Sequence, residues 1–179
     1  MKKLLMHICC APCFIMPFYR LRESYAVTGF WFNENIHPVR EYQNRHQCVK
    51  EFALQENIKL IDKNKYGLMD FIKKTIFNQE NRCYICYYDR LNMTAQCAKE
   101  RGFDCFSTSL LYSKRQNHEM LKEIGFTVAK EHSVEFMYQD FREYWKKGIE
   151  LSKEKGLYRQ TYCGCIFSEM ERYQEKSIV

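Results

Sequence analysis

The sequence predicts an α/β fold with a mainly parallel sheet and helices on both faces, a Rossmann-like three-layer sandwich formed by one domain over residues 1–179. Two observations favour it. Short segments rich in apolar, β-branched and aromatic residues alternate with longer segments whose apolar residues recur at helical spacing. The length of 179 residues also suits one domain. Because such folds bind ligands beyond the carboxyl ends of their strands, we expect a metal site at that edge.

The first half of the chain is interpreted as three strands and two helices. Residues 2–8 and 27–32 are short and apolar or aromatic, which favours strands. Helices are expected over residues 12–23 and 38–57, and each begins with a proline, whose missing N–H costs nothing in a first turn. Residues 59–62 predict a third strand. This strand–helix alternation is the pattern of a parallel sheet.

The second half continues the alternation. The expected elements are, in order, a short helix over 69–76, a helix over 83–102, a strand over 105–111, a helix over 113–125, a strand over 126–129 and a helix over 139–155. Gly102, Gly125 and Gly156 are expected to end the three longer helices, because glycine most easily adopts the left-handed conformation of a helix cap.

The composition predicts a soluble, cytoplasmic protein. Charged residues make up 28% of the chain, and its apolar runs are far shorter than the ~20 residues of a spanning helix. Lys2 and Lys3 precede a short apolar run, but His7 and Cys9 interrupt it before it reaches the length of a signal peptide. The net charge of +6 is compatible with an anionic partner. Glycine-rich motifs for dinucleotides or triphosphates are absent from the sequence.

Ten cysteines are the most informative feature of the composition. Cytosolic thiols are kept reduced, so this number favours metal binding or redox chemistry over structural disulfides. Seven of them form three clusters, which are Cys9, Cys10 and Cys13, then Cys83 and Cys86, then Cys163 and Cys165. Cys48, Cys97 and Cys105 are isolated and are expected to be small buried core residues.

The first two clusters have the spacing of metal ligands. Cys83 and Cys86 stand at the expected start of a helix, where two thiolates can converge on one centre, and another loop can complete four ligands. Zinc and iron–sulfur clusters both accept four thiolates, and a reduced pair without metal remains an alternative. Cys9 and Cys10 can ligate together only if the chain leaves the strand there. Cys10 and Cys13 also have the spacing of a thioredoxin-like motif.

The third cluster has a different character. A bridge between Cys163 and Cys165 would close a very small, strained loop, and strained disulfides are the labile and catalytic ones. Gly164 supplies the backbone freedom that such a loop needs. Two thiols that bind metal, or that do nothing, remain alternatives.

Five segments that span nearly the whole chain resemble the epoxyqueuosine reductases of the QueH family. They are LLMHICCAPC at 4–13, FNENIHPVREYQNR at 32–45, RCYICYYDRL at 82–91, FSTSLLYSK at 106–114 and YCGCIFS at 162–168. The resemblance implies an oxidoreductase that removes the epoxide oxygen of epoxyqueuosine at the wobble position of the tRNA anticodon, the last step of queuosine biosynthesis. It further implies that the enzyme works without cobalamin and receives its electrons from a donor that the sequence does not identify.

The resemblance also implies cofactors and their residues. A 4Fe–4S cluster falls on Cys9, Cys10, Cys83 and Cys86, and a redox-active pair falls on Cys163 and Cys165. An additional mononuclear iron is implied as well. Its candidate ligands are Cys13 and Asp89.

A tRNA substrate needs aromatic side chains for unstacked bases and cations for phosphates. The candidates lie beside the C-x-x-C motif and are Arg82, Tyr84, Tyr87, Tyr88 and Arg90, although at least one tyrosine could instead face the core. A second basic region is expected at His37, Arg40, Arg45 and His46, with a solvated helix face as the alternative. His7, inside a strand, is interpreted as a hydrogen-bonded core residue.

Two other functions fit parts of the pattern. A zinc-stabilised nucleic-acid-binding module would use the thiolates without catalysis. A thiol-disulfide oxidoreductase would use Cys10 and Cys13, but leaves the other two clusters without a role.

Overall fold

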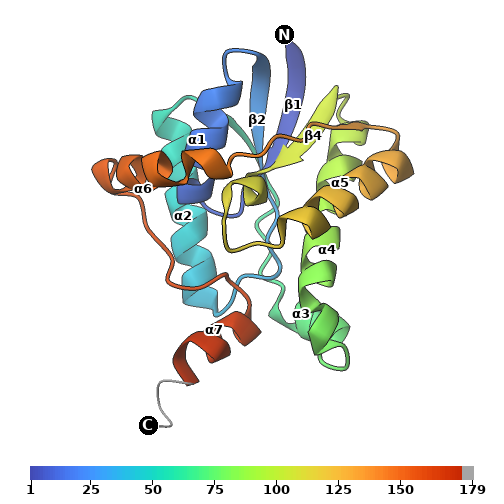
Figure 1. Cartoon of the computed structure of the whole chain (residues 1–179), viewed down its shortest axis with the longest axis vertical. Helices are drawn as coiled ribbons and strands as arrows, with labels where there is room; N and C mark the ends of the chain where they lie inside the picture. The colour runs from blue at the N-terminus through green and yellow to red at the C-terminus, as the bar shows by residue number, and fades with distance from the viewer. Residues whose placement is uncertain (175–179) are drawn as a thin grey trace.

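The computed structural model describes residues 1–174 and has five strands in one sheet with helices around it (Figure 1). The strands are β1 (Lys2–His7), β2 (Tyr25–Trp31), β3 (Lys59–Asp62), β4 (Cys105–Thr108) and β5 (Glu135–Phe136). The helices are α1 (Ala11–Leu21), α2 (Val39–Gln55), α3 (Leu68–Thr75), α4 (Arg82–Glu100), α5 (His118–His132), α6 (Trp145–Glu154) and α7 (Ile166–Tyr173). Within residues 1–174, no helix is long and apolar enough to cross a membrane.

The sheet is parallel throughout, with the strand order β3-β2-β1-β4-β5. From β1 the chain steps outward through α1 and α2, then returns through α4 to β4 and continues through α5 to β5. Because parallel crossovers are right-handed, the steps toward β3 and the steps toward β5 place their helices on opposite faces of the sheet. Accordingly α1 packs against α2 and α6, while α4 packs against α5. The predicted three-layer α/β fold is confirmed.

The strands β1, β2 and β4 direct their carboxyl ends toward one edge, where the site forms. His7 ties these ends together and is fully buried. Its Nδ1 lies 2.9 Å from the Thr108 hydroxyl, and its Nε2 lies 3.2 Å from both the Phe32 carbonyl and the Asn33 side chain. Burial lowers the pKa of His7 to about 4. The interpretation of His7 as a hydrogen-bonded core residue is confirmed.

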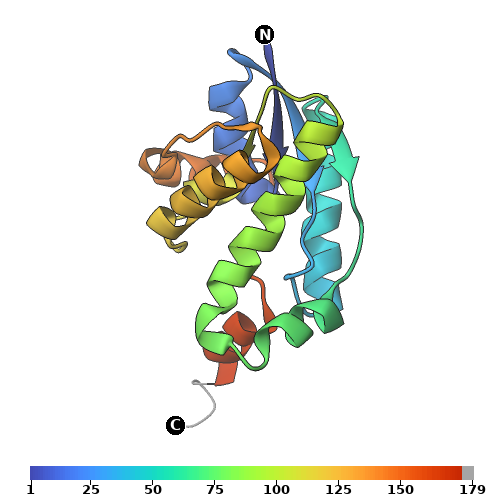
Figure 2. The same ribbon diagram turned by 90° about the vertical axis from the view of Figure 1, so that its right-hand side faces the viewer.

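Several elements differ from the predictions in their bounds, and one was missed. The strand predicted to reach residue 111 ends at Thr108, because the chain turns into a 3₁₀ helix at Ser109–Tyr112 that the Thr108 side chain caps. The helix predicted from residue 139 begins only at Trp145. The short helix α7 was not predicted. It lies beside α3 and the first turn of α4, at the end of the molecule remote from the N-terminus (Figures 1 and 2).

The strand predicted over residues 126–129 is wrong, because these residues belong to α5 and the fifth strand is β5. Gly125 does not cap the helix but lies buried inside it, where a Cβ atom would collide with the ring of Phe136. The helix ends instead at Ser133, which adopts the left-handed conformation with φ of 52°. Gly125 therefore permits α5 to approach β5 closely.

We predict that Gly125→Ala destabilises the protein by about 1–3 kcal/mol, since overpacking against Phe136 outweighs the gain in helix propensity. Urea unfolding measures the change. Thr127→Ala, on the exposed side of the same helix, is the matched control and should be close to neutral. The double variant Gly125→Ala/Phe136→Leu should recover part of the loss; a Gly125→Ala protein as stable as the wild type would contradict the packing argument.

Candidate functional site

Three buried cysteines gather at the carboxyl end of β1. The sulfur atoms of Cys9, Cys10 and Cys13 all lie within 4.8 Å of one another. Cys10 is the extended residue that precedes α1, so the chain does leave the strand there, and Cys13 follows in the first turn of the helix. The Ser109 hydroxyl, from the end of β4, accepts a hydrogen bond from the Cys9 amide at 3.0 Å and lies 3.3 Å from the Cys9 sulfur.

The protonation of this cluster favours a bound cation. Hydrogen bonds from Cys10 and Cys13 lower the pKa of the Cys9 thiol well below its usual range. Burial raises the pKa of Cys10, and hydrogen bonding within the cluster raises that of Cys13. Such a group loses one proton readily, but further ionisation in a buried site needs a compensating positive charge. Three soft sulfur donors of this kind suit a thiophilic metal.

A second group of thiols lies near the start of α4. Cys86 is buried and packs with Cys165 and Phe71, whereas Cys83 is exposed one turn earlier. Burial raises the pKa of Cys86 to about 12. Within residues 1–174, neither Cys83 nor Cys86 joins the close sulfur group of Cys9, so the four-ligand set that the resemblance implies stays a prediction.

Arg90 connects the two groups of thiols. Its buried guanidinium donates to the Cys86 sulfur at 3.0 Å and to the Cys86 carbonyl at 3.0 Å. The same side chain lines a cavity together with Cys9, Cys13 and Cys163. Arg90 was predicted as a substrate contact from its position in the motif, and the structure places its positive charge between the thiol groups.

The loop of the C-x-C motif is held against the start of α2 by Arg45. This guanidinium, 2% exposed, donates to the carbonyls of Cys163 and Tyr162 at 2.8 and 3.1 Å and pairs with Glu41 at 2.6 Å. Gly164 has φ of 151°, a region that favours glycine, and an added Cβ would lie 3.1 Å from the Arg45 guanidinium. Glycine is therefore required for this approach.

The expected second basic region around Arg45 does not form. His37 is buried, and its ring accepts a hydrogen bond from the Ile166 amide at 3.2 Å. His46 pairs with Asp62 at 2.8 Å, and Arg40 alone of the four residues is exposed. Both sequence interpretations, a nucleic-acid surface and a solvated helix face, are wrong, because most of this helix side faces the protein interior.

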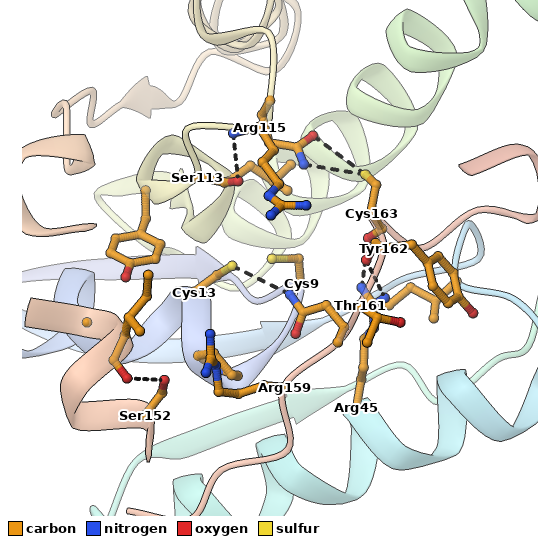
Figure 3. A pocket seen from close by; sticks show the side chains of 18 of the residues that line it. Cys9, Cys13, Arg45, Ser113, Arg115, Ser152, Arg159, Thr161, Tyr162 and Cys163 are labelled. Atoms are coloured by element: carbon orange, nitrogen blue, oxygen red, sulfur yellow. Dashed lines mark hydrogen bonds between the residues drawn. The ribbon is translucent and has the colours of Figure 1, made fainter. Parts of the chain in front are cut away.

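The thiols open onto a cavity of about 360 Å³ (Figure 3). Cys9 and Cys13 form part of its wall, and the exposed Cys163 stands across from them beside Gln116. Gln160, on the segment between α6 and α7, donates to the Cys10 sulfur at 3.0 Å. Sequence reasoning missed Gln160 and Ser109, since neither has a spacing signal that relates it to the cysteines.

The other predicted residues lie in several environments. Tyr84 and Tyr88 stack with ring centroids 6.1 Å apart, and Tyr84 is 45% exposed. Tyr87 is buried and donates to Gln116 at 2.8 Å, which confirms that at least one of these tyrosines faces inward. Arg82 pairs with Glu171, and its guanidinium lies 5.7 Å from the Phe167 ring. Asp89 pairs with Lys74 at 2.7 Å and does not line the cavity.

A parallel α/β sheet that carries a buried thiol cluster and further cysteines around one cavity is the arrangement expected of a protein that uses cysteines for metal binding or redox chemistry. Cys48, Cys97 and Cys105 are buried core residues, as predicted, and take no part. Comparison with known proteins narrows this class. The model of the family described as epoxyqueuosine reductase QueH matches residues 4–171.

Curated relatives named epoxyqueuosine reductase QueH agree with this match. The protein of Dehalococcoides mccartyi is 37% identical over 172 residues, which cover 96% of this chain and 94% of the relative. The protein of Thermotoga maritima is 35% identical, covering 98% and 94%, and that of Acinetobacter baylyi is 36% identical, covering 93% and 80%. The chain belongs to the QueH family of epoxyqueuosine reductases.

We predict that Arg45→Met lowers the free energy of unfolding by about 3–5 kcal/mol, because it leaves the buried Glu41 carboxylate without its cation. Denaturant unfolding measures this, and faster alkylation of Cys163 by iodoacetamide reports release of the loop. Arg40→Met, an exposed arginine of the same helix, is the control. Unchanged stability and unchanged alkylation would show that Arg45 does not hold the loop.

Proposed function

We propose that the protein is an iron–sulfur epoxyqueuosine reductase that works as a single domain and without cobalamin. It would deoxygenate epoxyqueuosine to queuosine at the wobble position of a tRNA anticodon, with electrons from an external donor. Membership of the QueH family supports the reaction. The observation that carries the proposal is that one cavity is lined by Cys9 and Cys13 on one wall and by Cys163 on another.

The residues fit the cofactors of this proposal. Cys9, Cys10, Cys83 and Cys86 would hold the 4Fe–4S cluster, which supplies single electrons when bound. The close group of buried sulfurs suits such a soft centre. For an additional iron, Cys13 is the ligand that the geometry favours, since Asp89 is engaged by Lys74.

Polar and charged side chains around this centre would position the thiols and balance their charge. Ser109 and Gln160 hydrogen-bond the sulfurs of Cys9 and Cys10 and hold them in place. Arg90 offsets negative charge near Cys86. Arg45 fixes the loop so that Cys163 faces the cavity.

The dithiol of Cys163 and Cys165 matches the electron count of the reaction. Oxidation of two thiols to a disulfide releases two electrons and two protons. Conversion of an epoxide to an alkene consumes two electrons and two protons and releases the oxygen as water. The external donor then returns the disulfide to the dithiol, which completes the cycle.

One anaerobic experiment tests the function. Purified protein should be brown, with broad absorption near 400 nm, and should convert epoxyqueuosine in tRNA to queuosine with a chemical reductant. A colourless, zinc-containing protein that binds tRNA without turnover would favour the zinc-stabilised module. Colourless protein that reduces disulfides would favour the thiol-disulfide oxidoreductase.

We predict that Cys83→Ala or Cys86→Ala abolishes stable cluster binding, because loss of one thiolate leaves an open iron site that is prone to oxidation. Iron and sulfide analysis of the anaerobically purified variants measures the loading. Cys97→Ala, at a buried cysteine of the same helix outside the site, is the control. Full loading of both variants would remove them from the ligand set.

We predict that Cys163→Ser and Cys165→Ser keep the cluster but lose repeated turnover, since four other thiolates are available to hold it. The variants should purify brown with wild-type iron and sulfide content, yet yield no queuosine over many cycles. Colourless variants would mean that the pair ligates the cluster. Brown and fully active variants would eliminate the redox role of the pair.

A further inference from the structure

The cavity beside the thiols is strongly cationic. Among the described residues that line it are five arginines and no aspartate or glutamate. The arginines are Arg45, Arg90, Arg115, Arg159 and Arg172. A concave, water-restricted surface with one sign of charge focuses the field and attracts anions.

Two of these arginines are already used by the protein. Arg45 is neutralised by Glu41, and Arg90 contacts the Cys86 sulfur, so both are buried parts of the framework. Arg115, Arg159 and Arg172 differ, because all three are exposed and none forms an ion pair with a carboxylate within residues 1–174. Their charges are therefore available to a ligand.

Two of these guanidinium groups converge on the thiols from different segments. Arg115 follows the 3₁₀ helix after β4, and Arg159 follows α6. Figure 3 shows their side chains extending from opposite walls toward the space around Cys9 and Cys13. Like charges that face one cavity repel each other, and a bound anion relieves that repulsion.

The inner wall suits a ligand that also carries hydrogen-bond donors. Asn35 and Gln160 both line this cavity. Their side-chain oxygens are buried and have no hydrogen-bond partner within the described chain. Asn35 is only 5% exposed. A phosphodiester group by itself offers no donor, whereas a nucleotide offers both phosphate oxygens and the N–H and O–H groups of its base and sugar.

We propose that Arg115 and Arg159 form a two-sided phosphate clamp that holds an RNA strand on either side of the nucleotide inserted into the cavity. The inference rests on the proposed function and deepens it, because it names the residues that position the tRNA. A nucleotide that leaves the base stack brings its flanking phosphates to the rim of the pocket it enters. Guanidinium groups suit phosphates through their planar, forked donors.

The test measures binding apart from catalysis. Fluorescence anisotropy of the anaerobic holoprotein is recorded with an anticodon stem-loop that carries ordinary guanosine at the wobble position. Arg115→Gln and Arg159→Gln should each weaken binding about tenfold, as expected for loss of a hydrogen bond to a charged group. The slope of log K against log salt should fall by roughly 0.7 for each lost single-strand phosphate contact.

Lys114→Gln and Lys153→Gln are the matched controls. Each removes one exposed positive charge close in sequence to a clamp arginine but outside the cavity lining. They should change binding less than twofold. Arg115→Lys and Arg159→Lys should recover only part of the affinity, since charge alone lacks the forked geometry.

Unchanged affinity in the arginine variants would overturn the clamp. Equal losses in the lysine controls would overturn it as well, since they would indicate a diffuse basic surface. Variants that lose affinity for a guanosine monophosphate but not for the stem-loop would identify a small-molecule site instead.

Wild-type protein that binds through the arginines but never forms queuosine would refute the proposed function and leave the clamp intact. Active enzyme whose arginine variants keep the wild-type KM for tRNA would refute the clamp alone.

Discussion

Charge balance around buried sulfur is the constraint on which the site depends. Arg90 is 3% exposed and has no carboxylate partner within residues 1–174. Its guanidinium donates to the carbonyl and sulfur of Cys86 and lies 5.9 Å from the centre of the Tyr87 ring. A buried cation without a carboxylate is costly unless nearby groups carry negative charge. The thiols on both sides of Arg90 can supply that charge once they are ionised. The same ionisation is what a thiophilic metal requires, so Arg90 and a metal-bearing thiolate set would stabilise each other.

The fold brings together cysteines that are far apart in the chain. The parallel order places β1 between β2 and β4, so the loop of Cys9 and Cys10 is flanked by Ser109 at the end of β4. The first turn of α4 and the segment before α7 then supply the other thiols from one end of the molecule (Figure 2). Arg45 closes this arrangement by fixing the backbone at Cys163. Each cysteine motif is local in sequence, but the site is made by long-range contacts that bring the motifs together.

The contrast between local motifs and long-range contacts explains how much of the structure the sequence could predict. Alternating strands and helices, the departure of the chain from β1 near Cys10 and the buried role of His7 follow from local patterns, and they are confirmed. Gly125 was misread as a cap because its close neighbour, Phe136, belongs to another element. Arg45 was misread as a surface cation because its partners are carbonyls more than a hundred residues away. Residue type and spacing carry no information about contacts of that kind.

The two cysteines of the C-x-C motif have different surroundings, and this difference suits the redox roles proposed for them. Cys163 is exposed and lines the cavity, whereas Cys165 is buried beside Cys86 and Phe71. A thiol that must meet the substrate needs access to the cavity, which Cys163 has. In the proposed mechanism, a thiol that exchanges electrons with a centre held by Cys86 would need proximity to that residue, which Cys165 has. Gly164 lets one short loop satisfy both needs, because its unusual φ turns the chain between the cavity and the interior.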